Sequence, residues 1–242
     1  SVTGEESALS DAVRAAEWIM ANRSLPDNGF RHDAQDTAGP YLGDTIYITR
    51  AFLKLYAVTA DRKWLRRAEE AAQFIEAKFK SDIGYIAAVP SLAGKLKPQP
   101  QLDENVAVAR TLNLLRYYTG NEVYGKAALH ALRYLAAPKV NENHGYAVAG
   151  ILLADKELGA PPLHITVGGR KDDPAARSLF LAAVALPASY KRVEWWDDRE
   201  GAMPNSDVEF PKFEKAVAFV CTDSRCSAPI LDPAKIGAFA AK

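Results

Sequence analysis

The first two thirds of the chain carry apolar residues at the three- and four-residue spacing of amphipathic helices. Near the start, Ala8, Ala12 and Ile19 follow this spacing. Between about residues 5 and 159 we therefore predict helices joined by turns, the last of them a single helix over residues 142–158.

A repeat is present within this helical part. Residues 42–75 align without a gap on residues 102–135, sixty positions later. Each copy predicts two helices joined by a short turn, because Thr59-Ala60-Asp61 and Thr119-Gly120-Asn121 combine a helix stop with a new N-cap. The matched pairs include Leu42 with Leu102, Asp44 with Glu104, Arg50 with Arg110, Trp64 with Tyr124, and Phe74 with Tyr134.

The loops of this helical part alternate in length. Turns within a predicted hairpin are about three residues long, whereas the connections over residues 21–40 and 81–100 have about twenty residues each. This alternation is typical of an (α/α) toroid, whose long loops gather over one mouth and commonly carry the function. A closed toroid of this type has six hairpins and the chain supplies about three, so we predict a partial toroid.

The last third of the chain has a different pattern. Pro161-Pro162 marks a break, after which strand-like and helix-like segments alternate, as in a right-handed parallel crossover. We therefore predict a mainly α fold with a smaller α/β part. A partial (α/α) toroid of helical hairpins over residues 1–159 is followed by a small parallel or mixed sheet with two helices over residues 160–242. The predicted elements of the second part are strands 163–167, 191–196 and 216–221 and helices 175–186 and 233–241.

Composition and charge restrict the classes of partner that the 242-residue chain could bind. It has 30 Lys and Arg against 30 Asp and Glu, and this balance argues against nucleic acid or a polybasic membrane anchor. No apolar run reaches the roughly 18 residues of a membrane span. The chain begins with Ser1 and has no signal peptide, so we expect a fragment of a longer protein, and either the bacterial cytoplasm or the periplasm fits.

The densest polar cluster lies in the first long loop and enters the following helix. Its carboxylates, with Glu104 at the position equivalent to Asp44, are candidates for acid and base work on a glycoside. The alternative is that these acids cap helices or lie exposed in the loop. We expect neither a metal nor a cofactor. The candidate catalytic residues are Asp33, Asp36, Asp44 and Glu104, and the candidate ligand-binding residues are His32, Tyr41, Tyr47, Asn105 and Arg110.

The two cysteines, Cys221 and Cys226, follow the third predicted strand. A turn of this length brings two sulfurs within bonding reach. The spacing is not that of a Cys-x-x-Cys redox motif, and no second Cys or His pair completes a zinc set. Three interpretations stay open: a structural bridge, an exchangeable bridge that serves a redox partner, and two free thiols.

Several segments of the chain occur in an order that is similar to a known family. They are residues 29–33, 39–44, 104–107, 162–167, 173–177 and 218–221, with Cys226 and Pro229. In this order the chain resembles the C-terminal part of the spermatogenesis-associated, thioredoxin-like family of thioredoxin-domain proteins over nearly its whole length. The resemblance implies a toroid similar to six-hairpin glycosidases and sugar epimerases, joined to an N-terminal thioredoxin-like domain that this sequence does not contain.

Three hypotheses for function follow. The first is a glycosidase- or epimerase-like toroid module of a thioredoxin-domain protein that binds or processes carbohydrate. The second is a redox-linked interaction module in which Cys221 and Cys226 exchange with a thioredoxin-like domain of the same protein. The third is a purely structural scaffold, because fold alone does not fix function.

Overall fold

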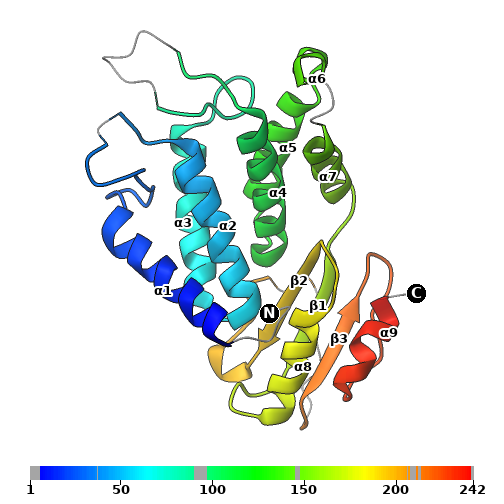
Figure 1. Ribbon diagram of the computed structural model, residues 1–242. Coiled ribbons are helices and arrows are strands. Elements are labelled where there is room, and N and C mark those ends of the chain that lie inside the picture. The colour runs from blue at the N-terminus through cyan, green and yellow to red at the C-terminus, as the bar shows by residue number, and fades with distance from the viewer. Residues whose placement is uncertain are drawn as a thin grey trace.

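A computed structural model describes residues 6–36, 38–89, 97–144, 148–205, 207, 211 and 214–240 of the chain. Most of these residues are helical, and a small sheet lies at one end of the helices (Figure 1). The helices of the first part are α1 (Glu6–Arg23), α2 (Leu42–Thr59), α3 (Arg62–Lys78), α4 (Leu102–Thr119), α5 (Glu122–Leu135), α6 (Pro138–His144) and α7 (Ala149–Leu158). The second part contains β1 (Leu163–Gly168), α8 (Pro174–Ala185), β2 (Lys191–Trp196), the short 3-10 helix η1 (Asp198–Glu200), β3 (Val217–Cys221), the 3-10 helix η2 (Pro233–Lys235) and α9 (Ile236–Ala240).

The helices form an arc of antiparallel hairpins. Helices α2 and α3 form one hairpin, and α4 and α5 form the next. Helix α4 contacts α2 on one side and α7 on the other. The loops before α2 and before α4 lie at one end of this arc, and the sheet lies at the other end (Figure 1). The predicted fold class, a partial toroid of hairpins followed by a small sheet, is confirmed.

The two short turns of the repeat have the same local structure. Ala60 and Gly120 end α2 and α4 in the left-handed conformation, with φ of 54° and 70°. Asp61 and Asn121 then cap α3 and α5, because each side chain accepts a hydrogen bond from the backbone two residues further on. The repeat in the sequence is therefore a repeat in structure.

The sheet is mixed, with the strand order β2-β1-β3. Strand β1 pairs in parallel with β2, where Ile165 lies opposite Val193, and antiparallel with β3, where Ile165 lies opposite Val220. These side chains form an apolar core with Phe180 of α8 and Ile236 of α9. Both predicted helices of this part therefore pack on one face of the sheet.

The helical part closes the outer edge of β2. The Val193 N–H, which a further strand would otherwise pair, donates to the Tyr118 hydroxyl at 3.2 Å. Asn205 donates to the Tyr117 carbonyl, and Lys171 donates to the carbonyl of Ala60. These contacts join two apolar cores, and a domain boundary at residues 159 and 160 stays a prediction.

One predicted element is wrong. The single helix over residues 142–158 is replaced by two helices, α6, which ends at His144, and α7, which begins at Ala149. Among the described residues, none of the helices combines the length and the apolarity that a membrane span requires.

The contact between Tyr118 and Val193 gives a stability test. Tyr118→Phe leaves a buried N–H without a partner, so we expect a loss of about 1–3 kcal/mol in the free energy of unfolding. Tyr117→Phe is the matched control, because Tyr117 contributes only its backbone carbonyl to the junction. Urea denaturation measures both variants, and equal stabilities would contradict the role of the hydroxyl.

Candidate functional site

Asp44 and Glu104 occupy the third position of α2 and α4, at the end of the arc where the long loops gather. Negative charge is favoured in the first turn of a helix. Neither helix has a side-chain cap, since Tyr41 and Gln101 at the N-cap positions make no such hydrogen bond. The two acids therefore hold equivalent positions without serving as N-caps.

Gly43 lets the two helix starts come together. The backbone N–H of Gly43 donates to the Glu104 carboxylate. A Cβ atom at Gly43 would lie 2.9 Å from Glu104 Oε1, so a side chain there would displace the Glu104 carboxylate. Gly43 lies in the 39–44 segment of the resemblance, but it was not among the candidate site residues. The repeat marks Gly43 as unusual, because the equivalent position in the second copy is occupied by the larger Asp103.

Each acid keeps one carboxylate oxygen without a partner. Asp44 Oδ2 and Glu104 Oε2 are both shielded from solvent and have no hydrogen-bond partner among the described residues. Burial, together with the neighbouring charges of Asp103 and Asp44, raises the pKa of Glu104 to about 7 against the opposing effect of the Gly43 N–H. Near neutral pH, Glu104 therefore holds a proton for part of the time.

Asp44 has a different environment. Its Oδ1 lies 3.1 Å from His32 Nδ1 in the preceding loop. This hydrogen bond and the charge of Asp44 raise the pKa of the exposed His32. The ring of Tyr41 stands edge-on to the His32 ring, with centroids 6.2 Å apart. The structure thus brings together four predicted residues: Asp44, Glu104, His32 and Tyr41.

Asp33 and Asp36 are engaged in the loop itself. Asp33 accepts hydrogen bonds from the backbone of Gln35 and Asp36, and these bonds lower its pKa. Asp36 accepts from the backbone of Ala38 and from the Tyr41 hydroxyl. Both acids hold the loop in shape, so we do not retain them as proton-transfer candidates.

The three remaining predicted residues lie on α2 and α4 and are Tyr47, Asn105 and Arg110. Tyr47 is partly exposed and lies beside Glu104 and Asp103. Partial burial and the charges of these two acids raise the pKa of Tyr47. Asn105 is fully buried, and its amide joins the backbone of Tyr85 and Gln101 through three hydrogen bonds. It supports the loop and does not reach a ligand.

Arg110 binds Glu157 of α7. The guanidinium makes two hydrogen bonds of 2.7 and 2.8 Å to this buried carboxylate. Arg110, predicted as a ligand-binding residue, is therefore engaged in an internal ion pair. Among the described residues, its repeat-equivalent Arg50 has no such partner.

A cavity of about 350 Å³ extends along the inner face of the arc. Helices α2, α4 and α7 line it, and residues 189–191 close it on the side of the sheet. Tyr47 and Asp103 place its rim beside the acid pair. Lys54 also lines the cavity. It was not a predicted site residue, and its repeat-equivalent is the apolar Leu114.

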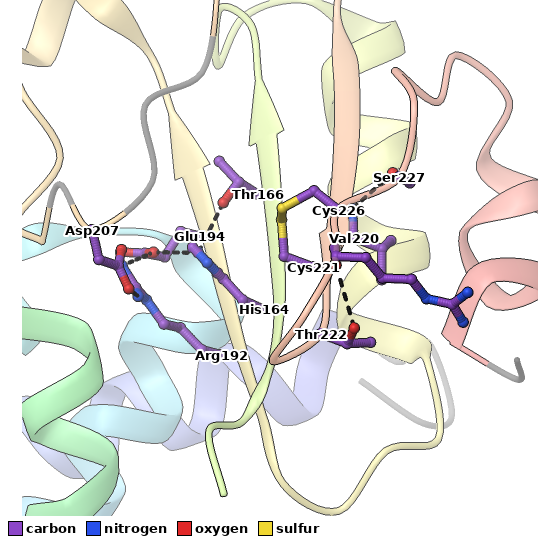
Figure 2. Close-up of a disulfide and its surroundings, with 11 residues drawn as sticks. His164, Thr166, Arg192, Glu194, Asp207, Val220, Cys221, Thr222, Cys226 and Ser227 are labelled. Atoms are coloured by element: carbon purple, nitrogen blue, oxygen red, sulfur yellow. Dashed lines mark hydrogen bonds and ion pairs between the residues drawn. A yellow bond between two sulfur atoms is a disulfide. The ribbon is translucent and has the colours of Figure 1, made fainter.

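The two cysteines form a disulfide at the end of β3 (Figure 2). This bond excludes two free thiols from the three interpretations that the sequence left open. Cys221 is only 5% exposed, whereas Cys226 lies on the exposed turn. The turn has hydrogen bonds of its own, from Thr222 N to Arg225 O and from Ser227 N to Val220 O.

A buried polar cluster lies on the sheet next to this disulfide. His164 is the antiparallel partner of Cys221, and its Nε2 lies 2.9 Å from both Thr166 Oγ1 and Glu194 Oε2. Glu194 also pairs with the fully buried Arg192 (Figure 2). These strand residues alternate with apolar ones, and in the sequence they are indistinguishable from a solvated face. Across the described part of the chain, no group of three or more His, Cys, Asp or Glu side chains could hold a metal ion.

Comparisons with known proteins found partial structural likeness. One similar solved structure is a UGL variant with dGlcA-Glc-Rha-Glc, which is 14% identical with a TM-score of 0.47. Another is the unsaturated glucuronyl hydrolase, responsible for the degradation of glycosaminoglycan, from Bacillus sp. GL1, which is 15% identical with a TM-score of 0.46. Each match covers 76% of this chain and 55% of the other, so the chain spans about half the length of either protein. No protein-family model and no curated protein matches the chain.

The pKa of Glu104 predicts a pH-dependent stability. Folding raises this pKa from 4.5 to about 7, so the folded protein binds the extra proton between these values and loses stability as the pH rises through them. Glu104→Gln removes this loss. We therefore expect the variant to gain melting temperature over the wild type at about pH 8 and to gain less at about pH 5.

The exposed Glu17→Gln is the control, since Glu17 pairs only with Lys63 on the surface. Its difference from the wild type is expected to stay constant with pH. A Glu104→Gln difference that is the same at both pH values would contradict a raised pKa.

Proposed function

We propose that this chain is a carbohydrate-processing module in which Glu104 donates a proton and Asp44 acts as the base. The observation that carries the proposal is the pair of adjacent carboxylates with one unpartnered oxygen each. Glycoside cleavage requires one carboxyl group that is protonated and one that is ionised. Different environments support this division of roles.

Glu104 suits the role of the acid. Its pKa of about 7 keeps a proton available near neutral pH, where a carboxyl group with an ordinary pKa has lost it. In the proposed step this proton passes to the oxygen of the leaving group as the glycosidic bond breaks. The charge of Asp44 nearby favours the protonated form of Glu104 before the reaction.

Asp44 suits the role of the base. Its Oδ1 lies 3.1 Å from His32 Nδ1, while Oδ2 has no partner among the described residues. The carboxylate takes a proton from water as the water attacks the sugar carbon. Tyr41 and Tyr47 flank the pair and offer ring faces, and Tyr47 also a hydroxyl, for orienting a sugar.

The context of the module is a further part of the proposal. The sequence resemblance supports a place as the toroid part of a thioredoxin-domain protein. The arc of hairpins is open on the side of α7, where Leu152 and Leu153 are exposed. The substrate is therefore best sought with this chain and with its longer parent side by side.

The acid pair predicts a large loss of activity on substitution. We expect Asp44→Asn and Glu104→Gln each to lower the rate of reducing-sugar release by about 10²–10⁴-fold, the usual contribution of a general acid or base. The measurement uses a panel of neutral and anionic oligosaccharides. Asp11→Asn and Glu17→Gln, on the exposed face of α1, are the matched controls and keep the wild-type rate.

Wild-type protein and parent without activity on any saccharide of the panel, together with no saccharide binding, would contradict the proposal. A structural scaffold would then remain. Activity that survives both substitutions would place the chemistry on other residues.

A second candidate function rests on the unequal exposure of the two cysteines. In this alternative, a thiolate of a thioredoxin-like dithiol attacks the exposed Cys226 sulfur and forms a mixed disulfide. The Cys221 thiolate leaves and takes up a proton. The second thiol of the partner then attacks the mixed disulfide, which releases Cys226 as a thiol and oxidises the partner.

The exposure difference gives a direct test. With oxidised glutathione, Cys221→Ser is expected to form a mixed disulfide at Cys226 about tenfold faster than Cys226→Ser forms one at the buried Cys221. Thiol counting and mass spectrometry follow the reaction, and reduced thioredoxin is expected to open the wild-type bridge while the chain stays folded. A bridge that thioredoxin reduces only in denaturant would contradict exchange and favour a structural role.

A further inference from the structure

The cavity on the inner face contains four basic side chains, and two of them are already engaged. Arg110 is held by both oxygens of Glu157. The Lys191 ammonium donates to the carbonyls of Ala183, Val184 and Leu186 at the end of α8. Glu157 thus neutralises the charge of Arg110, and the three donors of the Lys191 ammonium are all used.

The other two basic groups, Arg50 and Lys54, have no ion pair or hydrogen bond with any described residue. They lie four residues apart on α2, so that their side chains share one face of the helix and both line the cavity. Burial and the charges of Arg50 and Arg110 lower the pKa of Lys54. Two like charges on one face of a helix, neither of them in an ion pair with a described residue, favour the binding of an anion between them.

The contrast with the repeat supports this interpretation. Arg50 and Arg110 are equivalent residues of α2 and α4, and only Arg110 has an acidic partner. Of the residues that line the cavity, only Glu157 and Asp103 are acidic, and Asp103 lies at the rim beside Tyr47 and Glu104. The inner end of the cavity therefore keeps an excess of positive charge.

The position along α2 sets where such an anion would lie. Arg50 and Lys54 follow Asp44 by six and ten residues, which at 1.5 Å per residue is about 9 and 15 Å along the helix. This separation exceeds the width of one sugar ring. The anionic group would then belong to a sugar beyond the one that is cleaved.

We propose that the cavity binds an anionic oligosaccharide, with Arg50 and Lys54 holding a carboxylate or sulfate on a sugar next to the one at the acid pair. This inference rests on the proposed carbohydrate function. Arg50 and Lys54 act as specificity-determining residues and take no part in proton transfer. Tyr190, whose hydroxyl accepts a hydrogen bond from Asn113, lines the same end of the cavity.

The test compares two probes with the same sugar backbone, one anionic and one neutral: tetragalacturonate and its fully methyl-esterified form. Calorimetry on the Glu104→Gln variant measures binding without turnover. We expect the anionic probe to bind at least about tenfold tighter, with inorganic sulfate as a competitor, and we expect high salt to reduce the difference.

The variants Arg50→Gln and Lys54→Met, made singly and together in the same background, are expected to remove this preference. The matched controls are Arg66→Gln and Lys126→Met, which change exposed basic residues on α3 and α5 away from the cavity. Thermal melts check that each variant is folded. The proposal is overturned if the protein with both substitutions still prefers the anionic probe. It is also overturned if the folded Glu104→Gln variant binds the two probes equally or binds neither.

Wild-type hydrolysis is assayed separately, so the two proposals fail in different ways. Charge-selective binding without any hydrolysis contradicts the acid pair and leaves the anion site standing. Hydrolysis of neutral and anionic oligosaccharides at equal rates and affinities overturns the anion site and leaves the acid pair standing.

Discussion

The close approach of α2 and α4 at their first turns is the contact on which the site depends. Gly43 has no side chain, and the space that a Cβ would fill is occupied by the Glu104 carboxylate. The Gly43 N–H gives that carboxylate one hydrogen bond, while burial and two acidic neighbours oppose its charge. A larger residue at this position would push Glu104 away, and the pair of unlike acids would be lost.

The same helices connect the two ends of the molecule. Their first turns carry the acid pair under the long loops, and their last turns abut the sheet, where Tyr118 pairs with the edge of β2. The cavity runs between these ends and is closed by the segment that leads into β2. A rigid junction at the sheet therefore supports the wall of the cavity, and this links the α/β part to the proposed binding function.

The charged groups of the protein fall into two classes that are separated by their partners. Arg110, Lys191 and the buried Arg192 each bind internal acceptors, which offsets the cost of removing a cation from water. Arg50 and Lys54 are exposed and have no ion pair among the described residues, and the shielded oxygens Asp44 Oδ2 and Glu104 Oε2 have no hydrogen-bond partner there. A shielded oxygen without a partner is costly for folding, and a ligand that donates a hydrogen bond to it would offset that cost.

The sequence by itself determined the local structure. The three- and four-residue spacing, the turns at Ala60 and Gly120 and the alternating strands were enough for the helical hairpins and the small sheet, because these features depend on neighbours along the chain. It also placed Asp44 and Glu104 at equivalent positions through the repeat.

Only the tertiary structure decided which polar residues are free. Asp33 and Asp44 look alike in the sequence, yet one caps a turn and the other keeps an oxygen without a partner. Arg50 and Arg110 are equivalent in the repeat, yet only one meets Glu157, which lies 47 residues further along the chain. The physical reason is that hydrogen-bond partners and burial come from segments that are distant in sequence, and no local pattern records them.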